Sequence, residues 1–121
     1  MKNILIIDDE QIVLDVLQRI LSRLGYDAVV LEKGEEAIEK YNSQMFDLVL
    51  LDVLMPEKNG FDLAREMKDI NPDQKIIMVT GLGTAAAETH ADMKNVLIDN
   101  VLSKPFSYEK VKEIMVETLN Q

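Results

Sequence analysis

The chain has 121 residues, the length of one domain spanning 1–121, and carries 22 acidic against 13 basic side chains for a formal net charge of −9. A chain this acidic is repelled by phosphate backbones and anionic lipids, so we expect no direct binding to nucleic acid or to a membrane surface. No apolar run approaches the ~18 residues of a membrane span, so we expect no membrane insertion either. The absence of cysteine excludes thiol chemistry and Cys-based metal centres, and it is compatible with the cytoplasmic localisation that we expect.

Patterns typical of strands and helices alternate five times along the sequence. In chain order, the predicted elements are a strand at 3–7, a helix with apolar spacing from 13 to 24, a strand at 28–31, a helix at 35–42, a strand at 48–51, a helix with an apolar stripe from 61 to 70, a strand at 75–79, a helix at about 84–93, a short strand at 101–102 and a last helix reaching 119. Val16 and Ile70 belong to the helical stripes that we expect to face the core. The alternation predicts an α/β fold, a three-layer doubly wound sandwich with a five-stranded parallel sheet.

Capping and turn residues mark where these helices begin and end. Gly25 closes the first helix at the position that favours left-handed geometry, and Ser107 is the expected N-cap of the last helix. The pair at 71–72, Asn-Pro, ends the third helix, and residues 56–60 have the composition of a turn after the central strand.

Polar residues stand where the predicted strands end. Asp8 and Asp9 follow the first strand, Asp52 follows the third, Thr80 the fourth and Lys104 the fifth. An aspartate after a strand is usually a turn former or a helix cap, so each of these residues alone is weak evidence. Because the carboxyl ends of parallel strands meet at one edge of a sheet, we expect all five side chains to lie together there.

The chemistry expected at this edge follows from charge. Two carboxylates about 4 Å apart repel by ~4 kcal/mol at an effective dielectric constant near 20, so three together need a shared cation or raised pKa values. Oxygen ligands without histidine or cysteine favour Mg²⁺, which leaves coordination positions for phosphate oxygens. Asp52 is the expected nucleophile towards phosphorus, Lys104 the positive charge for the phosphoryl group and Thr80 a hydroxyl donor.

The order of these motifs resembles the receiver domain of the response regulators of two-component signalling, over the whole chain. The residues that carry the resemblance are Asp8-Asp9, the stretch 52–56 (Asp-Val-Leu-Met-Pro) with Gly60, Thr80, and the stretch 104–106 (Lys-Pro-Phe). The resemblance implies a chemotaxis-regulator-like, flavodoxin-like sheet with strand order 2-1-3-4-5. It also implies a cis peptide bond before the proline at 105.

The resemblance further implies a function and its residues. Asp52 is the phosphoacceptor, served by a sensor histidine kinase or a phosphotransfer protein, with Lys104 and Thr80 as catalytic residues. Mg²⁺ is held by Asp8, Asp9, Asp52 and the backbone carbonyl of Leu54. The output is a changed surface on the fourth helix, fifth strand and fifth helix, which controls a downstream protein or an attached effector, and the fourth-helix to fifth-helix face is also where a homodimer forms.

The sequence departs from the family pattern at Val101, where members usually carry an aromatic residue coupled to the threonine. We therefore expect signalling through the 81–87 loop and the fourth helix without an aromatic switch. Gly81 adds freedom to this loop. The segment between Thr80 and Lys104 is long for the family, so the fourth helix or its exit is expected to be irregular.

Several residues beside the site have alternative interpretations. Leu54 and Leu82 flank it and offer no polar partner to an in-line water, which predicts slow self-dephosphorylation. His90, on a polar Ala-rich helix, is expected at the surface without a phosphoryl or metal role. Glu10 is expected as a first-turn helix residue, with an influence on metal preference as the alternative.

Two other functions compete with the switch. A phosphohydrolase with an aspartate nucleophile normally needs a carboxylate two residues later, and that residue is Leu54. A degenerate scaffold would not need the intact set of acidic residues, threonine and lysine. We expect no turnover of an external metabolite, and the sequence leaves open whether the chain is a stand-alone regulator or the receiver part of a longer one.

Overall fold

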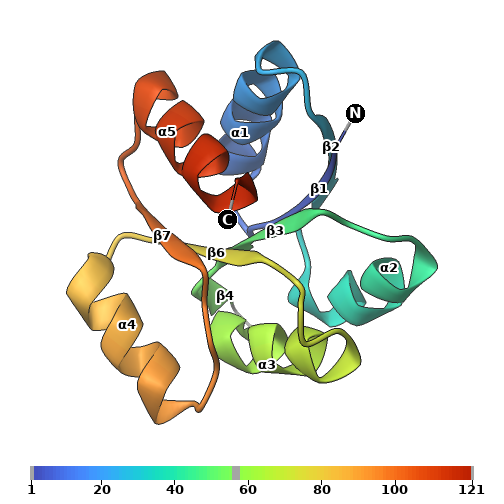
Figure 1. Cartoon of the computed structure of the whole chain (residues 1–121), viewed down its shortest axis with the longest axis vertical. Helices are drawn as coiled ribbons and strands as arrows, with labels where there is room; N and C mark the ends of the chain where they lie inside the picture. The colour runs from blue at the N-terminus through green and yellow to red at the C-terminus, as the bar shows by residue number, and fades with distance from the viewer. Residues whose placement is uncertain (1, 56–57, 121) are drawn as a thin grey trace.

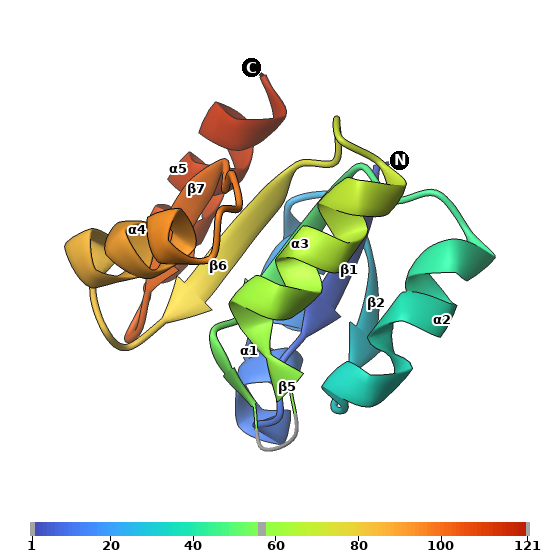
Figure 2. The same ribbon diagram turned by 90° about the horizontal axis from the view of Figure 1, so that it is seen from below.

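A parallel sheet lies at the centre of the molecule. For residues 2–55 and 58–120, which the computed structural model describes, the main sheet has five strands in the order β2-β1-β3-β6-β7 (Figures 1 and 2). These strands are β1 (Asn3–Ile7), β2 (Asp27–Leu31), β3 (Leu48–Asp52), β6 (Ile76–Thr80) and β7 (Asn100–Ser103). Every neighbouring pair is parallel. In order of appearance this is the predicted 2-1-3-4-5 arrangement, and the flavodoxin-like fold is confirmed.

Helices cover both faces of the sheet, which explains the continuous apolar runs of its strands. The helices are α1 (Gln11–Arg23), α2 (Ala37–Ser43, preceded by the 3₁₀ turn η1, Gly34–Glu36), α3 (Gly60–Ile70), α4 (Thr84–Met93) and α5 (Tyr108–Leu119). α1 and α5 lie on one face, and α2, α3 and α4 on the other (Figure 1). Ile4 and Ile6 pack on the face covered by α1 and α5, and Leu5 and Ile7 pack on the face covered by α2, α3 and α4. Alternate residues of β1 therefore point to opposite faces of the sheet.

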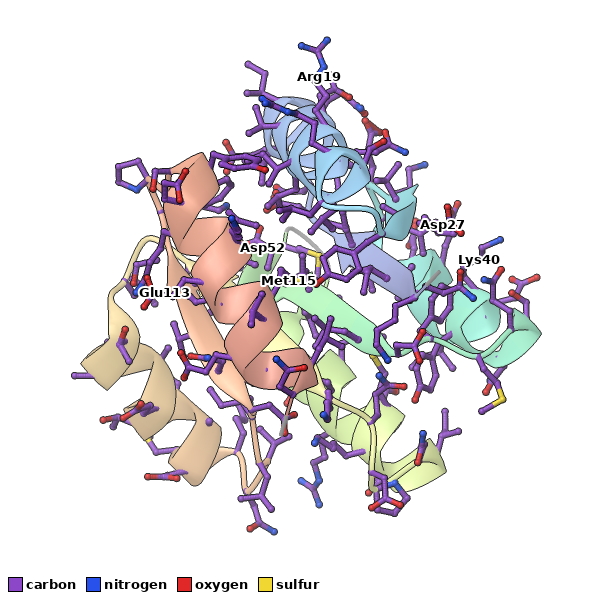
Figure 3. The ribbon with its side chains drawn as sticks, turned by 45° about the horizontal axis from the view of Figure 1, so that its top comes forward. Arg19, Asp27, Lys40, Asp52, Glu113 and Met115 are labelled. Atoms are coloured by element: carbon purple, nitrogen blue, oxygen red, sulfur yellow. The ribbon has the colours of Figure 1, made fainter. Side chains whose placement is uncertain are left out.

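The helix patterns predicted the buried sides with two errors. Val16 on α1 and Ile70 at the end of α3 are 41% and 49% exposed, whereas Leu14 is buried. The contact face of α1 is centred on residues 14, 17 and 21, and Ile70 is the last helical residue of α3. On α5, Met115 is buried against the sheet and Glu113 faces solvent (Figure 3).

The predicted helix ends are also confirmed. Gly25 has φ +90° after α1, and the Ser107 side chain accepts a hydrogen bond from the Lys110 amide. α4 ends at Met93 and is followed by an irregular segment in which Asn95 has φ +54°, as the long spacing predicted. None of the helices in the described part of the chain is both long and apolar enough to cross a membrane.

A short antiparallel hairpin follows the central strand, at the turn predicted for 56–60. Its strands are β4 (Leu54–Met55) and β5 (Lys58–Asn59), which the sequence did not predict as strands. Pro56 and Glu57, the first residues of the predicted turn, lie outside the described residues.

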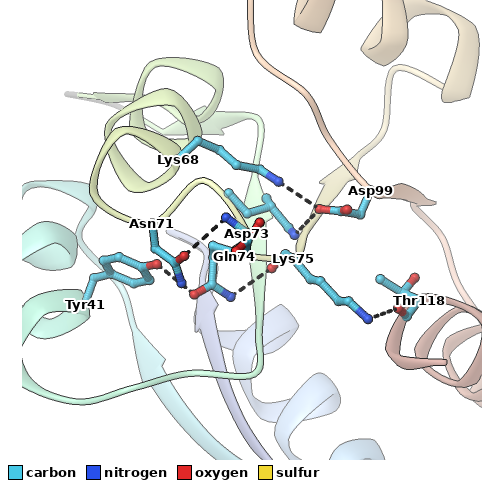
Figure 4. A network of polar contacts seen from close by, with 9 residues as sticks. Tyr41, Lys68, Asn71, Asp73, Gln74, Lys75, Asp99 and Thr118 are labelled. Atoms are coloured by element: carbon cyan, nitrogen blue, oxygen red, sulfur yellow. Dashed lines mark hydrogen bonds and ion pairs between the residues drawn. The ribbon is translucent and has the colours of Figure 1, made fainter. Parts of the chain in front are cut away.

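A network of polar contacts ties the helices to the amino-terminal edge of the sheet (Figure 4). Its hydrogen bonds join Tyr41 to Gln74, Lys68 and the Ile76 amide to Asp99, and Lys75 to the Thr118 carbonyl. These contacts link α2, α3 and α5 to the segments that enter β6 and β7. They lie at the opposite edge from Asp52 and Thr80, which end β3 and β6.

Gly60 is the residue that lets the hairpin return against the central strand. A Cβ added there would lie 2.0 Å from the Asp52 carbonyl oxygen, and the Gly60 amide donates to the Val53 carbonyl at 2.8 Å. We predict that Gly60→Ala lowers the free energy of unfolding by about 2–4 kcal/mol, because the backbone itself must move. Urea unfolding measures this change. Gly81→Ala is the control, since nothing lies within 4 Å of its added Cβ, and equal losses for both variants would contradict the explanation.

Candidate functional site

The predicted polar residues meet at the carboxyl edge of the sheet. Asp52 and Thr80 are the last residues of β3 and β6, Asp8 directly follows β1 and Lys104 directly follows β7. Thr80 and Asp52 are thus strand residues, buried to 2% and 5% exposure. The Lys104 amide donates to the Thr80 carbonyl at 2.7 Å, which fixes the segment after β7 beside the end of β6.

Lys104 is the residue that joins the others. Its Nζ lies 3.1 Å from Asp8 Oδ2, 3.3 Å from Glu10 Oε1 and 3.5 Å from Asp52 Oδ1. The two aspartates are buried and the lysine side chain is only 20% exposed, so these charges attract in a partly desolvated setting. The sequence placed Lys104 with the aspartates but did not foresee its contact with Glu10.

The acidic residues after β1 form a group that suits a hard cation. Carboxylate oxygens of Asp8, Asp9 and Glu10 lie within 4.8 Å of one another. Asp8 Oδ1 accepts the Glu10 amide at 2.9 Å, while the buried Oδ2 has the Lys104 ion pair but no hydrogen bond from the described residues. An oxygen-only set with a buried, incompletely satisfied carboxylate fits Mg²⁺. Glu10, the third carboxylate of this group, is paired with Lys104, and Asp52 remains the third ligand that we expect for the ion.

Burial and mutual repulsion perturb the charges of the site. Burial, followed by the charges of Asp8 and Asp9, raises the pKa of Asp52 to about 7 against the lowering effect of Lys104. Burial also raises the pKa of Asp8. Burial lowers the pKa of Lys104, but Asp52 and Asp8 outweigh it, so that pKa lies above its ordinary value. Without a cation, Asp52 therefore stays protonated between about pH 4 and 7, where an isolated aspartate is ionised.

A pocket of about 240 Å³ opens over Asp52. The residues that line it are Glu10, Asp52, Val53, Leu54, Thr80, Gly81, Leu82 and Lys104. The Thr80 hydroxyl oxygen accepts a hydrogen bond from the Leu82 amide at 2.9 Å, which orients it and leaves its own proton to donate. Leu54 and Leu82 are 63% and 48% exposed on its rim. The site therefore combines a carboxylate, a cation and a hydroxyl within reach of solvent.

The remaining predicted features lie outside this pocket. The Lys104–Pro105 peptide bond is cis, as expected. His90 is exposed, as predicted, and its ring stacks on Phe61 with centroids 6.0 Å apart. Val101 is buried and lines a second pocket, of about 290 Å³, between α4 and β7.

Comparison with known proteins identifies the family. The family model of the response regulator receiver domain matches residues 4–116. The chain belongs to this family. The chemotaxis protein CheY of Thermotoga maritima is 35% identical over 121 residues, which cover 99% of this chain and 96% of CheY. The autoinducer 1 sensor kinase/phosphatase LuxN of Vibrio campbellii is 32% identical over 98% of this chain, which spans only 14% of LuxN.

Receiver domains with solved structures share the fold closely. The response regulator TrrA of Thermotoga maritima, in a complex with Mg²⁺ and BeF, superposes with a TM-score of 0.86. It is 32% identical, over 98% of this chain and 99% of TrrA. The fold, the family and the acidic edge thus agree with one another.

The raised pKa of Asp52 predicts how stability depends on pH in the presence of a chelator. With a pKa of about 7 when folded and an ordinary value of 3.8, the folded chain binds more protons than the unfolded chain between about pH 4 and 7. The free energy of unfolding therefore falls as pH rises through this range.

Asp52→Asn removes the ionising group, so we predict that it raises the free energy of unfolding at pH 8 by about 1–3 kcal/mol and flattens the pH dependence. Urea unfolding in EDTA across this pH range measures both effects. Asp69→Asn, at an exposed position on α3, is the control for net charge. An unchanged pH profile in Asp52→Asn would contradict the assignment.

Proposed function

We propose that this receiver domain is a phosphorylation-dependent switch in which Asp52 accepts a phosphoryl group from the phosphohistidine of a sensor kinase or phosphotransfer protein. The observation that carries the proposal is the position of Lys104 Nζ, 3.5 Å from Asp52 Oδ1 in an open pocket beside the acidic group. A lysine there neutralises charge on a phosphoryl group bound to Asp52.

The transfer is a displacement at phosphorus. A carboxylate oxygen of Asp52 forms the new O–P bond while the P–N bond to the histidine breaks, and the imidazole leaves with the electron pair. Asp8, Asp9, Asp52 and the Leu54 carbonyl would hold Mg²⁺, with the carboxylates supplying the hard oxygen ligands. When bound, the ion neutralises negative charge on the phosphoryl oxygens. This residue set remains a prediction, because the carboxylates found nearest to one another are those of Asp8, Asp9 and Glu10.

Thr80 and the loop after it transmit the conformational response to phosphorylation. The Thr80 hydroxyl turns to the phosphoryl group and gives up the hydrogen bond that it accepts from the Leu82 amide. Loss of this hydrogen bond lets the loop after Thr80 move. We assign the response to residues 81–87 and α4, with β7 and α5 forming the rest of the output surface. Val101, buried beneath α4, has no ring to rotate, so the movement does not use an aromatic switch. Control of a downstream protein or attached effector, and homodimerisation through the α4 and α5 face, belong to the same proposal.

A small acyl phosphate tests the phosphoacceptor. We predict that the chain, incubated with acetyl phosphate and Mg²⁺, gains the mass of one phosphoryl group, and that neither EDTA-treated protein nor Asp52→Asn does so. Intact mass spectrometry measures the gain. Lys104→Ala is expected to lower the rate at least ~10-fold, whereas Lys112→Ala, an exposed lysine on α5, leaves it unchanged. Rapid release of phosphate without a modified protein would instead indicate a hydrolase, and no modification would indicate a scaffold.

The apolar rim predicts a long-lived phosphoprotein. Leu54 and Leu82 line the pocket without a polar atom that could hold an in-line water. We predict that Leu54→Asn with Leu82→Glu shortens the phosphoprotein lifetime at least ~10-fold, because polar side chains at these positions can hold an in-line water. Decay of the phosphorylated mass after removal of the donor measures this. Leu97→Asn, at an exposed leucine away from the pocket, is the control, and an unaltered lifetime in the double variant would exclude the explanation.

A further inference from the structure

Glu10 makes a contact with Lys104 that phosphorylation of Asp52 does not require. The Glu10 side chain accepts a hydrogen bond from Lys104 Nζ at 3.3 Å. Asp8 and Asp52 are paired with the same nitrogen at 3.1 and 3.5 Å. Glu10 is also part of the pocket lining, and its backbone amide is anchored by Asp8 Oδ1 at 2.9 Å.

We propose that Glu10 is a positioning residue that holds Lys104 in the unphosphorylated protein and competes with the incoming phosphoryl group for it. The proposal rests on the phosphorylation of Asp52 proposed above. Glu10 thereby slows phosphorylation and weakens the binding of a phosphoryl group, and its contact with Lys104 is exchanged when Asp52 is modified.

Lys104 is surrounded by anionic groups before Asp52 is modified. An ammonium group has three N–H donors, and in this structure three carboxylates surround it. A phosphoryl group on Asp52 therefore finds Lys104 already engaged. Glu10 and Asp8 therefore compete with the phosphoryl oxygens for the lysine.

Burial decides which carboxylate yields. The Asp8 side chain is 2% exposed and cannot exchange the lysine for water at low cost, while Asp52 is the group being modified. The Glu10 side chain is 63% exposed, so water replaces the lysine readily. Exposed ion pairs are weak, so this contact biases the position of Lys104 and is still readily broken.

The negative charge of Glu10 also slows phosphorylation. Asp8, Asp52 and Glu10 surround one lysine, and Asp9 lies close to Asp8 and Glu10, so the pocket repels an anionic phosphoryl donor. Removal of the Glu10 charge lowers this repulsion and at the same time frees an N–H donor of Lys104.

Glu10→Gln tests the proposal by its effect on phosphorylation. At a subsaturating concentration of acetyl phosphate with saturating Mg²⁺, we expect the rate, measured by intact mass, to rise ~3- to 10-fold. Glu10→Asp keeps the charge but is one methylene shorter, so it is expected to give a smaller rise through loss of the contact alone. Glu39→Gln, at an exposed position on α2, changes the net charge equally and should leave the rate unchanged.

Binding measurements separate positioning from a role in metal binding. Titrations followed by amide NMR shifts should show Mg²⁺ alone binding Glu10→Gln as it binds the unmodified chain, whereas beryllofluoride with Mg²⁺ binds Glu10→Gln ~3- to 10-fold more tightly. An unchanged or slower rate would overturn the proposal, and so would weakened Mg²⁺ binding, which would make Glu10 a metal ligand. Failure of the unmodified chain to be phosphorylated would instead refute the proposed function.

Discussion

The ion pairs of Lys104 with buried carboxylates are the interaction on which the site depends. Asp8 and Asp52 lie at the ends of neighbouring strands, where burial penalises their charges, and the lysine partly offsets this cost. The compensation is incomplete, since the pKa of Asp52 is still about 7. A site left short of positive charge suits a divalent cation. The proposed attack of Asp52 on phosphorus relies on that cation.

The two edges of the sheet have different physical roles. At the amino-terminal edge, hydrogen bonds centred on Asp99 and Gln74 tie helices to strand starts (Figure 4). At the carboxyl edge the loops bear the pocket, and Gly60 lets the hairpin after β3 come within contact of the Asp52 carbonyl. One edge thus holds the elements in place, while the other carries the groups that we propose respond to phosphorylation. This division suits a switch whose output passes through the loop after Thr80.

Much of this arrangement could be predicted from the sequence because parallel strands end at a common edge. The alternation of elements sufficed to place Asp52, Thr80 and Lys104 together, and the family resemblance supplied the strand order. What escaped prediction depends on side-chain direction. The expectation that Glu10 lies in the first turn of a helix is wrong, because Glu10 is the N-cap that precedes α1 and its side chain contacts Lys104. The exposure of Ile70 follows from its place at the last turn of α3, which an apolar spacing does not reveal.

A crystal structure of the chain with Mg²⁺ and beryllofluoride would show whether Lys104 contacts a phosphoryl group bound to Asp52. The account predicts beryllofluoride on the Asp52 carboxylate, the ion among the acidic residues after β1, and Lys104 Nζ within hydrogen-bonding distance of a fluorine. An Asp52 that stays unmodified, or a Lys104 that points away from the beryllofluoride, would contradict the account.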